Sequence, residues 1–141
     1  VSHADPSVRV CAVEALAKVA GHGTDVFEVF AERLVEDDAA QVRWAAALAV
    51  GAIANHRGNA RAVAALAAAI QDADRSVRHG AVQALTKVAE PGDARAIVAL
   101  VGGLRDLVED VRSAAAEALA VVAGRGCESV ADALARALSD A

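Results

Sequence analysis

The residues of this sequence that could do covalent or metal chemistry are few, and their spacing favours neither. The chain has four histidines and two cysteines, and Cys11 and Cys127 stand alone near its two ends. Isolated cysteines form neither a disulfide framework nor a metal-ligand pattern. No glycine-rich phosphate loop, nucleophile elbow or zinc spacing occurs. We therefore expect no catalytic, cofactor or metal site. Two buried or half-buried free thiols also suggest an intracellular protein, in the cytoplasm or a soluble organelle compartment.

Among the residues whose side chains could form ion pairs or bind a ligand, arginine recurs in a fixed pattern. A Val-Arg pair appears four times, at spacings of 34, 35 and 34 residues, as Val8-Arg9, Val42-Arg43, Val77-Arg78 and Val111-Arg112. These arginines lie beside acidic segments, so internal ion pairing is favoured over a basic binding stripe. The net charge of −5 also argues against a nucleic-acid partner, because such binders usually carry a basic stripe.

The repeated pair belongs to a longer repeated helix, here called helix A. Apolar residues follow each motif valine at steps of four, eight and eleven positions, which form one face of a helix. In the first repeat they are Val8, Ala12, Leu16 and Val19. Their equivalents are Val42, Ala46, Val50 and Ile53, then Val77, Ala81, Leu85 and Val88, then Val111, Ala115, Leu119 and Val122. These residues are called the helix A stripe, and we expect them to form the core.

A second helix, helix B, follows each helix A after a glycine-containing turn. Its stripe comprises Phe27, Phe30 and Leu34, then Val63, Leu66 and Ile70, then Ile97, Leu100 and Leu104, then Ala131, Leu134 and Leu138. Acidic linkers such as Glu36-Asp37-Asp38 join each helix B to the next helix A, where carboxylates cap free N–H groups. Glycine after helix A supplies a left-handed cap.

The pattern predicts an all-α fold: a right-handed α-solenoid of four stacked antiparallel helix pairs, eight helices in all. A single pair could not bury its stripe alone, whereas stacking makes a continuous core. The repeats span about residues 5–35, 36–71, 72–105 and 106–141 of one domain. The first residue is not Met, so we expect this domain to belong to a longer protein. No apolar stretch reaches the roughly 18 residues that span a bilayer, so no membrane partner is expected.

The motif Asp5-Pro6-Ser7-Val8-Arg9, and Asp74 to Arg78 in the third repeat, resembles HEAT repeats of the short kind named after phycobilisome lyases. The resemblance covers essentially the whole chain. It implies that helices B line a concave face, and that the motif Asp and Arg form a ladder between repeats. Arg9, Arg43, Arg78 and Arg112 would be ladder residues. Their Asp partners match only at Asp5 and Asp74, since Ala39 and Val108 replace them elsewhere, so an irregular ladder is expected.

Catalytic relatives of this fold need groups that the chain lacks. HEAT-like hydroxylases hold iron with His-Glu pairs, and no histidine here is followed by Glu. Bilin lyase subunits handle a large tetrapyrrole, for which one Trp and two Phe offer little stacking surface. His22 and His56 occupy equivalent turns, but repeat spacing of roughly 10 Å makes a shared metal awkward. A solvated position is favoured for both histidines.

The second repeat departs from its siblings at positions predicted to point away from the core. Trp44 and Leu48 stand where the third repeat has His79 and Gln83. Trp is the residue type most enriched in binding hot spots. These two residues therefore form a candidate partner site, against the alternative that Trp44 folds onto its own molecule.

The predicted groove-facing side of the helices B is a second candidate. Its middle consists of small residues, with arginines near one rim: Arg61, Ala64, Ala68, Arg95, Val98 and Gly102. Small residues let a helix or extended peptide approach closely, and the arginines suggest an acidic segment in that partner. The alternative is that small residues merely tighten the superhelix.

The favoured function is a non-catalytic scaffold or adaptor module, expected to be monomeric, that binds a protein or peptide. The alternative is a subunit of a bilin lyase or a similar modifying enzyme. A third possibility is that the repeats only space other domains.

Overall fold

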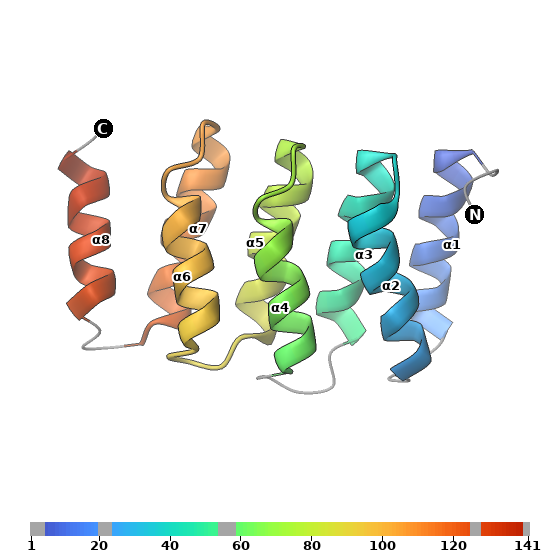
Figure 1. Ribbon diagram of the computed structural model, residues 1–141, viewed down its shortest axis with the longest axis horizontal. Coiled ribbons are helices and arrows are strands. Elements are labelled where there is room, and N and C mark those ends of the chain that lie inside the picture. Colours follow the sequence, from blue (N-terminus) through green and yellow to red (C-terminus); the bar gives the residue numbers. More distant parts are fainter. Residues whose placement is uncertain (1–4, 20–23, 54–58, 125–127, 140–141) are drawn as a thin grey trace.

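The computed structural model describes residues 5–19, 24–53, 59–124 and 128–139, and within them the chain forms eight α-helices and no strand (Figure 1). The helices A are α1 (Pro6–Val19), α3 (Ala40–Ile53), α5 (Arg75–Val88) and α7 (Glu109–Val122). The helices B are α2 (Thr24–Glu36), α4 (Ala60–Ala69), α6 (Ala94–Gly103) and α8 (Glu128–Ser139). The predicted all-α solenoid of helix pairs is confirmed.

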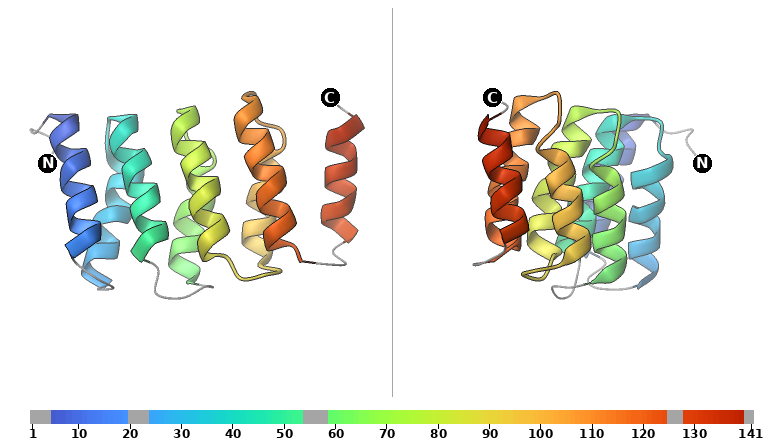
Figure 2. Two further views of the ribbon diagram at one scale, coloured as in Figure 1. Left: turned by 180° about the vertical axis from the view of Figure 1, so that it is seen from behind. Right: turned by 60° about the vertical axis from the view of Figure 1, so that its left-hand side comes forward.

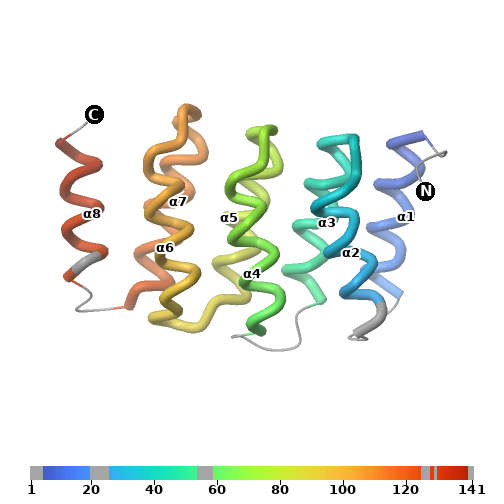
Figure 3. The backbone as a smooth tube through the Cα atoms, viewed as in Figure 1, coloured from blue at the N-terminus to red at the C-terminus, as the bar shows by residue number. Residues whose placement is uncertain are grey.

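The helices form a row of repeats with α1 and α8 at opposite ends (Figures 1 and 2). The helices A stack on one another, and the backbone trace returns through helix B after each of them (Figure 3). The most extensive contacts between the layers join each helix B to the helix A that follows it: α2 to α3, α4 to α5 and α6 to α7. The tightly packed pair is therefore the one around the acidic linker, and contacts within a repeat are fewer.

The helix A stripe forms the core in repeats two to four. Val42, Val50, Val77 and Leu85 are all 0% exposed, and their equivalents in α7 are buried as well. Close helix approach depends on small residues: a Cβ added at Gly51 of α3 would lie 2.9 Å from the Cβ of Ala84 in α5. The prediction of a continuous core holds for these three repeats.

The stripe of the first repeat does not follow the prediction. Val8 is 59% exposed and Val19 is 84% exposed, and Ala12 and Leu16 are exposed as well. Of the residues of α1, only Val13 is buried, and α1 packs mainly on α3. The physical reason is that no preceding helix B covers α1 in the part of the chain that the structure describes.

Short polar side chains start several helices, as the linker sequences predicted. Asp74 accepts hydrogen bonds from the N–H groups of Ser76 (2.8 Å) and Val77 (3.4 Å), and Asp5 accepts one from the N–H of Ser7 (2.8 Å). Asn59 caps α4 in the same way. Helix α7 differs, because the side chain of Val108 at its N-cap cannot accept a hydrogen bond. Gly124 after α7 has φ +71°, the left-handed conformation predicted for the turns.

Arginines and aspartates form a regular ladder along the stack. The guanidinium of Arg9 donates two hydrogen bonds to the carboxylate of Asp37, each of 3.0 Å. Arg43 pairs likewise with Asp72 (2.9 and 3.2 Å), and Arg78 with Asp106 (2.6 and 3.1 Å). Each aspartate is also joined through its backbone carbonyl to the next arginine: Arg43 donates to Asp37, Arg78 to Asp72, and Arg112 to Asp106. Consecutive repeats are thus connected by charge-assisted bonds.

The ladder corrects the sequence prediction in its choice of carboxylates. Asp5 and Asp74 are helix caps, whereas the ladder uses an aspartate two positions before the cap in repeats two to four. The departures at Ala39 and Val108 therefore do not interrupt the ladder. The missed signal was present in the sequence, since an aspartate stands five residues before the motif valine at Asp37, Asp72 and Asp106.

Two of the ladder carboxylates, Asp37 and Asp106, have a lowered pKa. Burial by itself raises the pKa of Asp37, but the hydrogen bonds from Arg9 and from the N–H of Ala39, together with nearby arginine charges, outweigh it. The net pKa lies below its ordinary value. The pKa of Asp106 is lowered for the same reasons, with Arg78 and the N–H of Val108 as donors.

Candidate protein-binding site

Trp44 lies on α3 with its indole directed at α5. A Cβ added at Gly80 of α5 would lie 2.8 Å from Cδ1 and 3.1 Å from Nε1 of Trp44. The indole therefore rests on the bare backbone of Gly80 and is half-buried. The prediction of an outward-facing Trp is only partly right, because a glycine in the next repeat leaves space that the indole fills. Part of the ring remains accessible.

Leu48 lies beside Trp44 and contributes to the same contact. Its Cδ2 would be 3.8 Å from a Cβ at Gly80, and the side chain is half-buried. The residues at the equivalent position in repeats one and three, Glu14 and Gln83, are exposed. The apolar patch predicted at the second repeat therefore exists, but it lies between α3 and α5.

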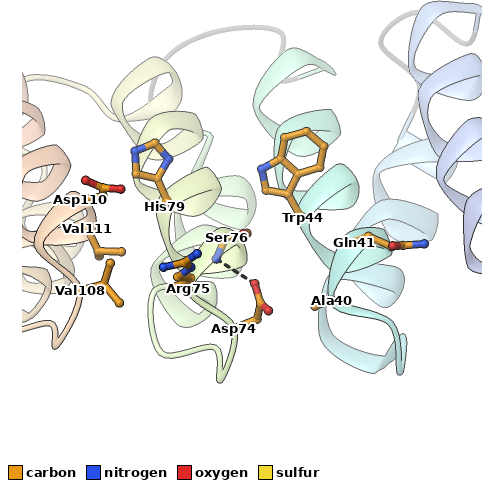
Figure 4. Close-up of a pocket in the computed structure, with 10 residues that line it drawn as sticks. All are labelled: Ala40, Gln41, Trp44, Asp74, Arg75, Ser76, His79, Val108, Asp110 and Val111. Carbon is orange, nitrogen blue, oxygen red and sulfur yellow. Dashed lines mark hydrogen bonds between the residues drawn. The ribbon is translucent and has the colours of Figure 1, made fainter.

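A groove of about 680 Å³ opens beside Trp44 and crosses the N-terminal halves of α3, α5 and α7 (Figure 4). It is lined by Ala40, Gln41, Trp44, Asp74, Arg75, Ser76, His79, Val108, Asp110 and Val111. Trp44 and Ala40 provide an apolar surface on α3, and half-buried Val108 provides another at the start of α7. The two apolar surfaces are separated by the polar residues of α5.

The polar centre of the groove carries both signs of charge. Arg75 is exposed in the first turn of α5, and His79 one turn later is half-buried. Asp110 is exposed in the first turn of α7, on the opposite side of the groove from Trp44 (Figure 4). The carboxylate of Asp74 caps α5 and is thus already hydrogen-bonded. Arg75 is therefore the cation best placed to meet an acidic group of a bound segment.

Sequence reasoning found Trp44 but missed the residues of α5 and α7 that share its groove. Gln41, Ser76 and Asp110 each stand directly before a motif valine, at spacings of 35 and 34 residues. Since stacked repeats bring equivalent positions side by side, this register could have indicated the groove. The identity of the flanking residues, Arg75 and Val108, has no periodic signal.

The candidate site on the helices B is also present as an exposed face. Ala68, Arg95, Gly102 and Val98 are exposed, the last by 73%, and Ala64 is half-buried. Their spacing places them on the outer side of α4 and α6. A Cβ added at Gly102 would meet nothing closer than 4.0 Å, so this position lies open to solvent.

Arg61, predicted at the rim of that face, is engaged within the molecule. It forms an ion pair with Glu28 of α2, and its guanidinium carbon lies 4.9 Å from the centre of the Phe27 ring. A cation over an aromatic face is attracted by the ring quadrupole. Arg61 thus joins the second repeat to the first. In the described residues no ion pair involves Arg95.

A family of known repeat proteins matches this chain. The profile of a family described as HEAT repeats matches residues 27–120. This range runs from within α2 to within α7 and covers most of the chain. The chain belongs to the HEAT-repeat family. A search of curated proteins finds no match.

Family membership confirms the resemblance that the Asp and Val-Arg motifs indicated. HEAT repeats are commonly protein-interaction scaffolds and are typically non-catalytic. The match does not separate an interaction module from a bilin lyase subunit, so that alternative stays a prediction. No helix of the described residues is long and apolar enough to cross a membrane.

Several residues singled out from the sequence lie outside the described part of this HEAT-repeat chain. They are His22, His56 and Cys127. Cys11 is described and is a free, exposed cysteine. The expectation of a buried or half-buried thiol at this position was wrong, because Cys11 lies on the uncovered part of α1.

Proposed function

We propose that this HEAT-repeat chain is a protein-interaction module that binds a peptide segment of a partner in the groove beside Trp44. The groove itself carries the proposal: a half-buried indole and a second apolar surface flank exposed charges across three repeats. Apolar pockets with a few convergent polar groups are typical binding sites. A Trp side chain of the groove contributes strongly to affinity, because Trp is enriched among the residues that carry most binding energy.

The lining residues define the chemistry of the segment that fits. One apolar residue of the peptide packs on Trp44 and Ala40, and a second packs on Val108. An acidic residue between them faces Arg75. As in the sequence analysis, we expect the partner segment to be acidic. The cation that would meet it is now Arg75 on α5, instead of the arginines of the helices B.

The test uses Trp44 as its own reporter, because it is the only Trp and the chain has no Tyr. Peptides are selected from a random library displayed on phage, and Trp-free versions are synthesised. We expect their binding to shift the emission of Trp44. We expect Trp44→Ala to weaken binding at least about 30-fold, equivalent to about 2 kcal/mol for a hot-spot residue.

Val98→Ala provides the matched control, because Val98 is an exposed apolar residue on the helices B. It should leave affinity unchanged. Peptides that bind Trp44→Ala as tightly as the parent chain, or that lose affinity with Val98→Ala instead, would contradict the proposal. A selection that yields no binding peptide would favour the spacer role.

A further inference from the structure

The groove beside Trp44 crosses the helices that line it instead of following one of them. Its residues come from the N-terminal ends of α3, α5 and α7, and these helices run side by side in the stack (Figure 2). Figure 4 shows Arg75 and Ser76 between Trp44 on one side and Val108 on the other. A segment that lies along the groove therefore passes from one repeat to the next.

The distance between the two apolar surfaces sets the length of such a segment. Stacked helices lie roughly 10 Å apart, so two steps of the stack separate α3 from α7 by about 20 Å. The indole of Trp44 is directed at α5, which shortens the span to about 15–20 Å. An extended segment rises about 3.3 Å per residue and covers this span in about five or six residues. A helix rises about 1.5 Å per residue and needs about 10 to 13.

The direction of the groove favours the extended segment. A helix lying in it would cross α3, α5 and α7 at nearly right angles. Such crossings are among the rarer helix packings, because the ridges and grooves of helix surfaces favour smaller angles. An extended segment has no such ridges to match and can follow the groove across all three helices.

The polar side chains between the apolar surfaces suit an extended backbone. A helix bonds its own N–H and C=O groups, whereas an extended segment offers them to its surroundings. Gln41 and Ser76 are exposed at the groove, and His79 is half-buried there. Each of these side chains can donate and accept hydrogen bonds. Among the described residues no hydrogen bond engages the three side chains, so they are available to a bound backbone.

We propose that the groove binds an extended segment in which two apolar residues lie about five or six positions apart with an acidic residue between them. This inference rests on the proposed function and adds the conformation and spacing of the partner segment. The apolar residues pack on Trp44 and Val108, and the acidic residue meets Arg75, which is exposed. Gln41 and Ser76 bond to the backbone of the segment.

Two synthetic peptides, titrated into the full chain by calorimetry, test the spacing. One has leucines about five positions apart with a glutamate between them. The other has its leucines about eleven positions apart, on one face of a helix. We expect the first to bind at least about 30-fold more tightly, because only it reaches both apolar surfaces.

Proline in the shorter peptide tests the conformation. Proline is compatible with extended backbone but breaks a helix. At a position between the leucines it should weaken binding by less than about fivefold, the worth of one hydrogen bond. A loss of all binding would show that the bound peptide is helical.

Gln41→Ala tests the contact with the peptide backbone. It should weaken binding of the shorter peptide about fivefold, as expected for one hydrogen bond. Gln83→Ala is the matched control, since Gln83 is an exposed glutamine of α5 that does not line the groove, and it should leave affinity unchanged. Circular dichroism verifies that both variants are folded. Equal affinities of the two variants would contradict the backbone contact.

Trp44→Ala separates failure of this inference from failure of the proposed function. If the helix-spaced peptide binds more tightly and Trp44→Ala weakens that binding, the groove is the binding site but the extended segment is wrong. If neither peptide binds at millimolar concentration, or Trp44→Ala leaves binding unchanged, the proposed function and this inference are both wrong.

Discussion

Helices α1 and α5 have similar sequences and different environments. Both are 14 residues long, and equivalent positions share Ser, Val, Arg, Ala, Val, Ala, Leu, Lys and Val. Leu85 of α5 is 0% exposed, whereas Leu16 of α1 is 37% exposed. Helix α5 is packed between α3 and α7 and beneath α4, but α1 packs mainly on α3. The same amphipathic pattern is thus a core element or a surface, depending only on its neighbours.

The largest expected effect comes from truncating the leucine at equivalent positions of the two helices. Leu85→Ala should lower the free energy of unfolding by about 3 kcal/mol, because it leaves a cavity in a packed core. Leu16→Ala should cost less than about 1 kcal/mol, since its site is already open to water. Urea denaturation followed by circular dichroism measures both. Equal losses would contradict the contrast drawn between α1 and α5.

The ladder gives a second comparison of the two helices. Asp37 holds Arg9 of α1, and Asp106 holds Arg78 of α5. Replacing either by Ala should cost roughly 2 kcal/mol, because a half-buried arginine loses a hydrogen-bonded carboxylate partner. Asp37→Ala should also lower amide hydrogen-exchange protection in α1, which packs mainly on α3, whereas Asp106→Ala should leave that protection unchanged.

Asp38→Ala is the control for this prediction. Asp38 also contacts Arg9, at 2.9 Å, but its side chain is 79% exposed. An exposed ion pair contributes little, so the loss should stay below about 0.5 kcal/mol. If Asp38→Ala lowered the free energy of unfolding more than Asp37→Ala, the buried ion pair between Arg9 and Asp37 would not be the one that attaches α1.

The next difference lies on the face that α5 packs against the helix A before it, α3. Ala84 of α5 is buried against Gly51, whereas its equivalent Ala15 in α1 is exposed. Gly51→Ala would place a Cβ 2.9 Å from that of Ala84, so it should cost about 1–2 kcal/mol through overpacking. Thermal unfolding measures the change. Gly102→Ala is the control: its position is open, so the added Cβ should stabilise α6 by up to about 1 kcal/mol. If Gly51→Ala also stabilised the protein, α3 and α5 would not be in close contact at Gly51.

The smallest effect is a dependence of stability on pH. The folded-state pKa values of Asp37 and Asp106 are lowered, so the unfolded chain binds protons first as pH falls. Their contribution is therefore present above the ordinary Asp pKa of 3.8 and is lost as pH falls through the lower folded value. Urea midpoints at pH 7, 5 and 3 should drop mainly in the last interval. In the variant with both aspartates changed to Asn, that drop should shrink, and an unchanged drop would exclude the ladder as its source.

Local sequence patterns predict much of this architecture. The period of 34 to 35 residues, the apolar stripes and the turn glycines predicted all the described helices, because helix formation depends on residues within a few turns. The caps at Asp5 and Asp74 were predictable for the same reason. Of the residues around the candidate site, the sequence indicated only Trp44 and Leu48, because these two differ from the equivalent residues of the other repeats.

Tertiary structure decided what depends on residues about one repeat apart. It directed Arg9 to Asp37 rather than Asp5, placed Trp44 on Gly80, and buried the α5 stripe between its neighbours. Each of these outcomes follows from how one repeat is stacked on the next. The sequence by itself therefore determined the helices and the faces they must cover. Only the packed stack determined which faces are covered and which remain free to bind.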